Sequence, residues 1–166
     1  MKIIAVRGDI AEVDVDAVVN PADATSRGIG QKGGSARRPR RLVERAGQEV
    51  ESEAVARGPV HVGDAMLTTG GRLRCKYVIH APMGGRSDSL DPEAVKLSTL
   101  AALRFAAGSG LRSVAIPALP PGEATTRALV GALKAFDEEN GLEEVFIVGQ
   151  NGEIVSAIKR ELGRGN

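Results

Sequence analysis

Short apolar runs alternate along the chain with stretches in which apolar residues recur at helical spacing. The runs predict strands at residues 2–6, 17–20, 64–69, 76–81, 113–118 and 144–148. The helical spacing predicts helices around residues 42–54, 92–108, 129–136 and 154–162. Strands that alternate with helices in this way are typical of an α/β fold, with a mostly parallel sheet covered on both faces.

The helix beginning near residue 92 has the clearest start signal. Asp91 can cap it, Pro92 suits its first position, and Glu93 favours the positive end of the helix dipole. Its apolar side is predicted to carry Leu97, Leu100, Ala101 and Phe105.

Length and composition narrow the class of protein. A chain of 166 residues without a repeat or linker predicts one domain, residues 1–166. A net charge of +1, with no Trp, one Tyr and three Phe, argues against nucleic acid as a partner. Cys75 is the only cysteine, so an intrachain disulfide and a multi-cysteine zinc site are excluded. We expect a cytoplasmic protein without a leader peptide, membrane segment, metal or cofactor.

One segment stands apart from this pattern. Residues 24–41 lack periodicity and are rich in Gly, Ser, Arg and Lys. They follow the strand predicted at 17–20, so they start at the carboxyl end of the sheet, where ligands bind in folds of this kind.

Five segments in a fixed order resemble the macro domain family over about residues 3–162. They are Gly8-Asp9-Ile10, the D-A-V-V-N-P-A-D segment at 16–23, Gly33-Gly34, the K-Y-V-I-H-A-P segment at 76–82, and A-I-P-A-L at 115–119. The resemblance implies a three-layer α/β/α sandwich with a mixed, mostly parallel central sheet. It also implies a cleft for ADP-ribose, and an ADP-ribosylated protein as a candidate partner.

The resemblance assigns roles at both ends of such a ligand. Asp9 would accept a hydrogen bond from the adenine amino group, with Ile10 beside the ring. Asn20 matches the first asparagine of the family's N-A-A-N segment. Asp23 stands where the second asparagine contacts the distal ribose, so Asn20 and Asp23 are the candidate catalytic residues.

Two loops would hold the phosphates between these ends. Paired glycines let backbone N–H groups approach a phosphate closely, which favours the loop containing Gly33, Gly34 and Ser35. The second loop, together with one residue after the last strand, completes the predicted ligand-binding set: Ala118, Leu119, Pro120, Pro121, Gly122 and Gln150.

Several positions depart from the family's pattern. Pro120 and Pro121 have no backbone N–H, so the second loop loses two donors that a phosphate could use. Asp23 replaces an amide donor by a carboxylate, and Glu123 adds negative charge nearby. Arginines at positions 37, 38, 40 and 41 could replace the lost donors or form a solvated face.

Simpler interpretations of the same residues stay open. Asp9 could be a turn residue bonded to local backbone, and Asn20 could brace the end of its strand. His80 is typical of a buried structural histidine, His61 of a surface residue, and Cys75 of a packing residue.

Three functions remain at this point. The first is binding of ADP-ribose or a related adenine nucleotide. The second is hydrolysis of an ADP-ribosyl bond or of O-acetyl-ADP-ribose, with Asp23 as the base. The third is an interaction module on a degenerate fold, for example one that binds RNA through the arginines.

Overall fold

The structure is a computed structural model that describes residues 1–21, 39–84, 90–119, 122–136 and 141–164, apart from the side chains of residues 39–41. Its strands are β1 (Lys2–Arg7), β2 (Ala17–Asn20), β3 (Met66–Thr69), β4 (Tyr77–His80), β5 (Ser113–Pro117) and β6 (Glu144–Gly149). Its helices are α1 (Pro39–Ala46), α2 (Gln48–Arg57), α3 (Pro92–Gly108), α4 (Glu123–Ala135) and α5 (Gly152–Gly163), with a 3-10 turn η1 (Ile10–Glu12).

All six strands form one sheet in the order β1-β6-β5-β2-β4-β3. The first five strands in this order are parallel to one another, and the edge strand β3 pairs with β4 in the antiparallel direction. The carboxyl ends of β1, β6, β5, β2 and β4 therefore lie along one edge of the sheet. The register places Asn20, the last residue of β2, opposite His80, the last residue of β4.

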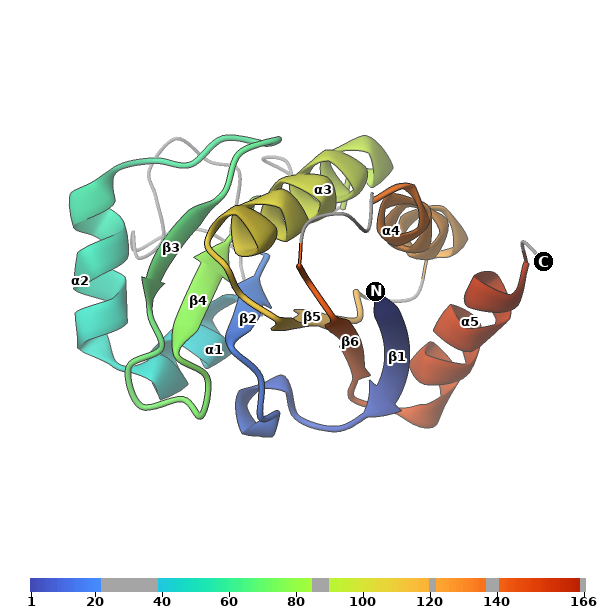
Figure 1. Ribbon diagram of the computed structural model, residues 1–166, viewed down its shortest axis with the longest axis horizontal. Coiled ribbons are helices and arrows are strands. Elements are labelled where there is room, and N and C mark those ends of the chain that lie inside the picture. The colour runs from blue at the N-terminus through green and yellow to red at the C-terminus, as the bar shows by residue number, and fades with distance from the viewer. Residues whose placement is uncertain (22–38, 85–89, 120–121, 137–140, 165–166) are drawn as a thin grey trace.

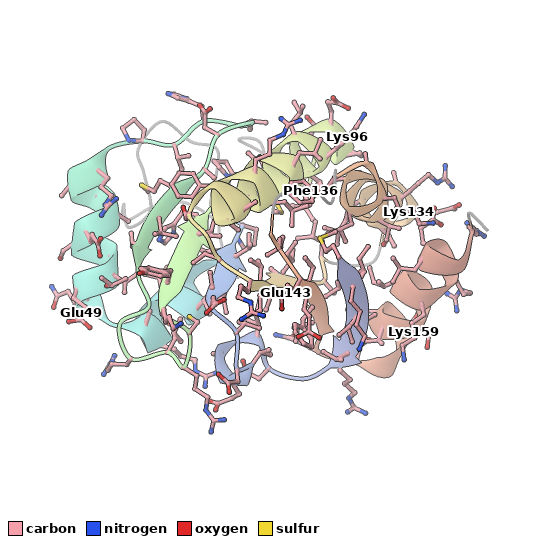
Figure 2. All side chains as sticks on the ribbon, viewed as in Figure 1. Glu49, Lys96, Lys134, Phe136, Glu143 and Lys159 are labelled. Carbon is pink, nitrogen blue, oxygen red and sulfur yellow. The ribbon has the colours of Figure 1, made fainter. Side chains whose placement is uncertain are left out.

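Helices cover both faces of this sheet, which makes three layers (Figure 1). Helices α3, α4 and α5 share the larger core with Val19, Ile79 and Ile116 of the strands. Helices α1 and α2 share a second core with Val18 and Val78, the alternate residues of the same strands. Figure 2 shows Lys96, Lys134 and Lys159 on the outside of these layers. The predicted α/β/α sandwich with a mixed, mostly parallel sheet is confirmed.

The apolar stretch at 42–54 forms two helices rather than the one that was predicted. Gly47 interrupts it with a φ of 108°, a conformation that favours glycine, and its N–H donates to Val43 O at 3.0 Å. The apolar residues still make one buried surface: Leu42, Val43, Ala46, Val50 and Ala54.

The predicted apolar side of α3 is not its buried side. Leu97 and Phe105 are 41% and 37% exposed, whereas Ser98 and Thr99 are fully buried. The Ser98 hydroxyl donates to the carbonyl of Pro82, and that of Thr99 to Val95 O at 2.6 Å. Because these bonds satisfy the two hydroxyls, α3 can bury Ser98 and Thr99 on the same face as Val95 and Leu103.

The described part of the chain contains no helix whose length and apolar content would allow it to cross a bilayer.

Candidate functional site

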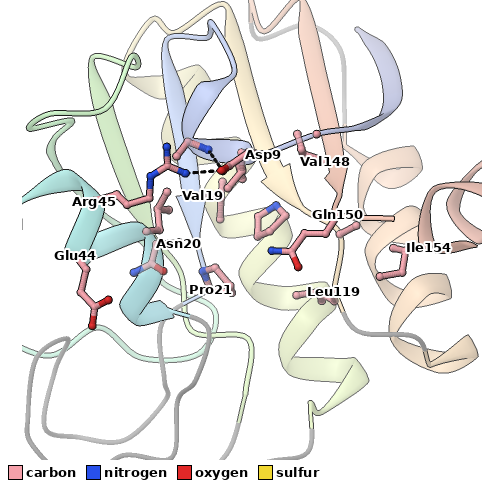
Figure 3. Close-up of a pocket in the computed structure, with 16 residues that line it drawn as sticks. Asp9, Val19, Asn20, Pro21, Glu44, Arg45, Leu119, Val148, Gln150 and Ile154 are labelled. Carbon is pink, nitrogen blue, oxygen red and sulfur yellow. Dashed lines mark hydrogen bonds and ion pairs between the residues drawn. The ribbon is translucent and has the colours of Figure 1, made fainter. Parts of the chain in front are cut away.

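A cleft of about 740 Å³ opens at the carboxyl edge of the sheet (Figure 3). It lies among the ends of β1, β2, β5 and β6 and is closed on one side by α1. Its lining comprises residues 8–11, 19–21 and 117–119 together with Leu42, Glu44, Arg45, Val148, Gln150 and Ile154. This volume lies within the range of pockets that hold small-molecule ligands.

Asp9 stands at the end of the cleft that follows β1. Its Oδ1 caps η1 by accepting from Ala11 N at 3.0 Å, so the local turn bond considered for this residue is present. Its Oδ2 forms an ion pair with Arg45 of α1, drawn as a dashed line in Figure 3. The side chain is 55% exposed, so the carboxylate can still receive a donor from the cleft.

Arg45 joins this end of the cleft to α1. Its guanidinium bonds Asp9 and also Glu12, which itself lies near Arg74. The hydrogen bond that Arg45 donates to Asp9 raises the pKa of Arg45 above its ordinary value, and the nearby Glu12 adds to the effect. The positive charge of Arg45 is therefore shared between the carboxylates of Asp9 and Glu12.

Asn20 forms part of the inner wall of the cleft. It is fully buried, and its Nδ2 lies 3.1 Å from His80 Nδ1. Its Oδ1 is buried and has no hydrogen-bond partner among the described residues. A buried amide oxygen without a partner is costly, so a donor from a ligand would stabilise it.

His80 supports Asn20 from the neighbouring strand and does not itself line the cleft. Its Nε2 lies 2.8 Å from Thr68 Oγ1, and its ring is fully buried. Burial lowers the pKa of His80 from 6.5 to about 4, with a smaller opposing effect of Glu53 and a further lowering by Arg57. The imidazole is therefore neutral near pH 7, as expected for a structural histidine.

The turn between β6 and α5 supplies the opposite wall. Gly149 is tightly enclosed, since a Cβ there would lie 2.8 Å from Val155 Cγ2. Asn151 Oδ1 accepts from Ile154 N at 3.0 Å and so caps α5, which begins beside Gln150 in the cleft wall. The start of a helix carries partial positive charge, which favours an anion at this side.

The structure brings together part of the predicted ligand-binding set. Six of the predicted residues line the cleft: Asp9, Ile10, Asn20, Ala118, Leu119 and Gln150. Gly122 is the N-cap of α4 and is not among the lining residues. The remaining predicted residues lie outside the described residues: Asp23, Gly33, Gly34, Ser35, Pro120 and Pro121.

Sequence reasoning missed two features of the cleft. Arg45 was not singled out, because a charged residue on a helix looks like any solvated position. The pairing of Asn20 with His80 was also missed, although both end parallel strands that could have been aligned. Within the described ranges, no group of three or more His, Cys, Asp or Glu side chains is arranged to hold a metal ion.

Comparison with known proteins assigns the family. A family model described as "Macro domain" matches residues 19–128, about two thirds of the chain. This chain belongs to the macro domain family. A macro domain-containing protein of Mesorhizobium japonicum is 32% identical over 84% of this chain and 81% of its own length.

Other relatives differ in how much of their length this macro domain covers. An Aquifex aeolicus protein is 41% identical, with 98% of this chain and 99% of the relative aligned. An Aeropyrum pernix protein is 39% identical over 69% of this chain, and the aligned part is 58% of that relative.

Solved macrodomains share the fold. The Trypanosoma brucei macrodomain, in a structure described as a complex with ADP-ribose, has a TM-score of 0.79 at 22% identity, covering 95% of this chain and 68% of that one. The Oceanobacillus iheyensis macrodomain with ADP has a TM-score of 0.74 at 20% identity, covering 96% and 88%.

Proposed function

We propose that this macro domain binds ADP-ribose, or a closely related adenine nucleotide, in the cleft at the carboxyl edge of its sheet. Family membership supports this proposal, and so do the ligands named for the related solved macrodomains. The observation that carries it is the buried Oδ1 of Asn20, an acceptor in the cleft wall to which no described residue donates.

The proposed orientation follows from the chemistry of the two ends. The exposed carboxylate of Asp9 can accept from the adenine amino group, and Ile10 offers apolar surface beside it. Oδ1 of Asn20 can accept from a hydroxyl of the distal ribose. The diphosphate between them would lie near the start of α5.

Isothermal titration calorimetry tests this proposal with ADP-ribose, ADP, AMP and NAD. We expect heat from ADP-ribose binding, and an affinity reduced at least about tenfold in Asn20→Leu, because the loss of a hydrogen bond and the added bulk act together. The free energy of unfolding of Asn20→Leu should fall by roughly 1–3 kcal/mol, because His80 Nδ1 loses its donor and a larger side chain must fit a fully buried position.

Ser98→Ala provides a matched control. It also removes a fully buried polar group, but Ser98 does not line the cleft. We expect it to lower stability and leave the affinity for ADP-ribose unchanged. Absence of binding heat from wild-type protein near millimolar concentration, or equal losses of affinity in the two variants, would contradict the proposed function.

An ADP-ribosyl group attached to a protein presents the same chemistry, so an ADP-ribosylated protein belongs to the same proposal. Hydrolysis stays a separate prediction that depends on Asp23, outside the described residues. RNA binding through the arginines at 37, 38, 40 and 41 is likewise a prediction that no described contact supports.

A further inference from the structure

Three polar side chains on neighbouring strands form a chain of hydrogen bonds that ends in the cleft wall. Thr68 of β3, His80 of β4 and Asn20 of β2 are each no more than 1% exposed. The distances are 2.8 Å from Thr68 Oγ1 to His80 Nε2 and 3.1 Å from His80 Nδ1 to Asn20 Nδ2. The ladder between β2 and β4 aligns Asn20 with His80, so backbone pairing sets this contact.

The hydrogen bonds in this chain have one direction. Asn20 turns its Nδ2 towards His80 Nδ1, and because an amide nitrogen only donates, Nδ1 accepts. The Thr68 hydroxyl, 2.8 Å from Nε2, can accept there while it directs its own proton to the carbonyl of Thr69 at 3.2 Å. The single proton of the neutral imidazole then lies on Nε2, and Nδ1 is an acceptor. With Nδ2 bonded to Nδ1 in this way, Oδ1 is left on the other side of the amide.

We propose that Thr68 and His80 are positioning residues that hold the amide of Asn20 with its oxygen towards the ligand. The cleft then selects a ligand that carries a hydroxyl donor at this point over one that carries an acceptor. This inference rests on the proposed function for the identity of the ligand, but the direction of the hydrogen bonds does not depend on it.

A purely structural role would predict a different arrangement. If the polar chain served only stability, its last member would end on a partner, as the hydroxyls of Ser98 and Thr99 do on backbone carbonyls. Instead, the chain ends beside the cleft on an acceptor that has no partner within the described ranges.

The tautomer of His80 provides a direct readout. Because the protein has two histidines, the imidazole signals in a nitrogen-15 correlation spectrum can be assigned with a His61→Gln variant. Near pH 7 we expect His80 to be protonated at Nε2 alone. A spectrum with the proton on Nδ1 would overturn the proposal, because Asn20 would then have to turn its oxygen to His80.

Thr68→Val tests the effect on ligand selection. Valine has nearly the shape of threonine but cannot accept from Nε2, so the Nδ1–H form becomes competitive and the amide can turn. We expect this variant to show both tautomers and to lose roughly two- to tenfold in affinity for ADP-ribose. Its affinity for ADP, which has no distal ribose, should stay at the wild-type value.

Thr99→Val is the matched control, because Thr99 is also fully buried and donates to a backbone carbonyl, in α3. It should leave the His80 tautomer and both affinities unchanged. Equal losses for ADP and ADP-ribose in Thr68→Val, or the same loss in Thr99→Val, would overturn the proposal.

The outcomes separate this inference from the proposed function. Wild-type protein that binds ADP-ribose but has the Nδ1–H tautomer would refute the positioning role alone. Wild-type protein with the Nε2–H tautomer that binds no ADP-ribose would refute the proposed function and the selection of a ribose hydroxyl, while the hydrogen-bond direction would stand. The wild-type spectrum decides the direction even if Thr68→Val does not fold.

Discussion

The two ends of β2 use polar side chains in opposite ways. At the amino end, Asp16 Oδ2 accepts from Arg112 N at 2.9 Å and from Ser113 N at 3.2 Å, and Oδ1 accepts from Lys76 Nζ at 3.0 Å. At the carboxyl end, Asn20 bonds His80 through Nδ2 while its Oδ1 has no partner in the described structure. One end joins three strands with satisfied bonds, and the other retains an unsatisfied acceptor beside the cleft.

This difference indicates that the amino edge of the sheet contributes to stability and the carboxyl edge to ligand binding. The backbone carbonyl of Asp16 also accepts from Lys76 N and Tyr77 N, so this residue holds the starts of β4 and β5 against β2. The bonds at this amino edge can offset the cost of an unsatisfied polar group at the opposite edge. Changes at the amino edge should therefore affect stability and leave ligand binding intact.

The largest effect is expected at Gly71, in the turn that packs the amino edge against α1. Its φ is 56°, and a Cβ there would lie 2.1 Å from the carbonyl oxygen of Ala46. Because backbone on both sides must shift, Gly71→Ala should lower the free energy of unfolding by about 4 kcal/mol in urea titrations.

Gly131→Ala is the control for that change. Gly131 lies within α4, and a Cβ there would meet no described atom within 4 Å beyond its chain neighbours and the backbone of its own helix. Alanine there should raise stability by up to about 1 kcal/mol through its helix propensity. Similar destabilisation in both variants would show that the turn at Gly71 is not the rigid element that the comparison requires.

The second effect is a pH dependence at the carboxyl end. His80 has a folded pKa of about 4 and an ordinary value of 6.5, so the unfolded chain takes up a proton between these values and the folded chain does not. The stabilising effect is complete above pH 6.5 and is lost as pH falls towards 4. The free energy of unfolding should therefore decrease by about 3 kcal/mol across this window.

Urea titrations at several pH values check this expectation. His80→Gln should flatten the slope between pH 6.5 and 4, whereas His61→Gln should keep it, because His61 is exposed. A wild-type slope that persists in His80→Gln would assign the pH dependence to another group.

The third expected effect is a loss of stability when the Asp16 carboxylate is removed. Removal of the carboxylate in Asp16→Ala leaves two backbone N–H groups without their acceptor, which should cost about 2 kcal/mol of unfolding free energy. The bond from Arg112 N is the main cause of the lowered pKa of Asp16, opposed by burial and supported by Lys76. Its stabilising effect is therefore present above the ordinary value of about 4 and is lost as pH falls below it.

The control for this change is Asp14→Ala, two residues earlier at an exposed position. It should change stability little, and calorimetry should give the same ADP-ribose affinity for both variants. A large loss of affinity in Asp16→Ala would mean that the two ends of β2 are not independent.

The sequence predicted strands and helices well where the apolar residues of the pattern are also the buried residues of the fold. Val18, Val19, Val78 and Ile79 are apolar and fully buried, and their runs identify β2 and β4. The bounds of α3 were predicted as well, but its buried face was not, because Ser98 and Thr99 are buried through hydrogen bonds that a hydrophobicity pattern does not contain. The prediction also joined α1 and α2, since a single glycine does not reveal its φ.

The site was predictable only in part for a related reason. Asp9 follows the end of β1, and Asn20 is the last residue of β2. Their positions in the sequence therefore indicate that both lie at the carboxyl edge of the sheet. Arg45 contacts Asp9 although it lies 36 positions later in the sequence. The proposed direction of the Asn20 amide depends on Thr68 of β3, which is two strands away in the sheet. Such contacts arise from tertiary packing and have no local signature.

The antiparallel strand β3 has one further consequence, for self-association. It forms an outer border of the sheet, where unpaired backbone donors could recruit a strand from another molecule. The Thr69 N–H donates to Glu53 Oε2 at 3.0 Å, and Glu53 also pairs with Arg57 of the same helix. A carboxylate from α2 thus occupies a backbone donor that an incoming strand would need.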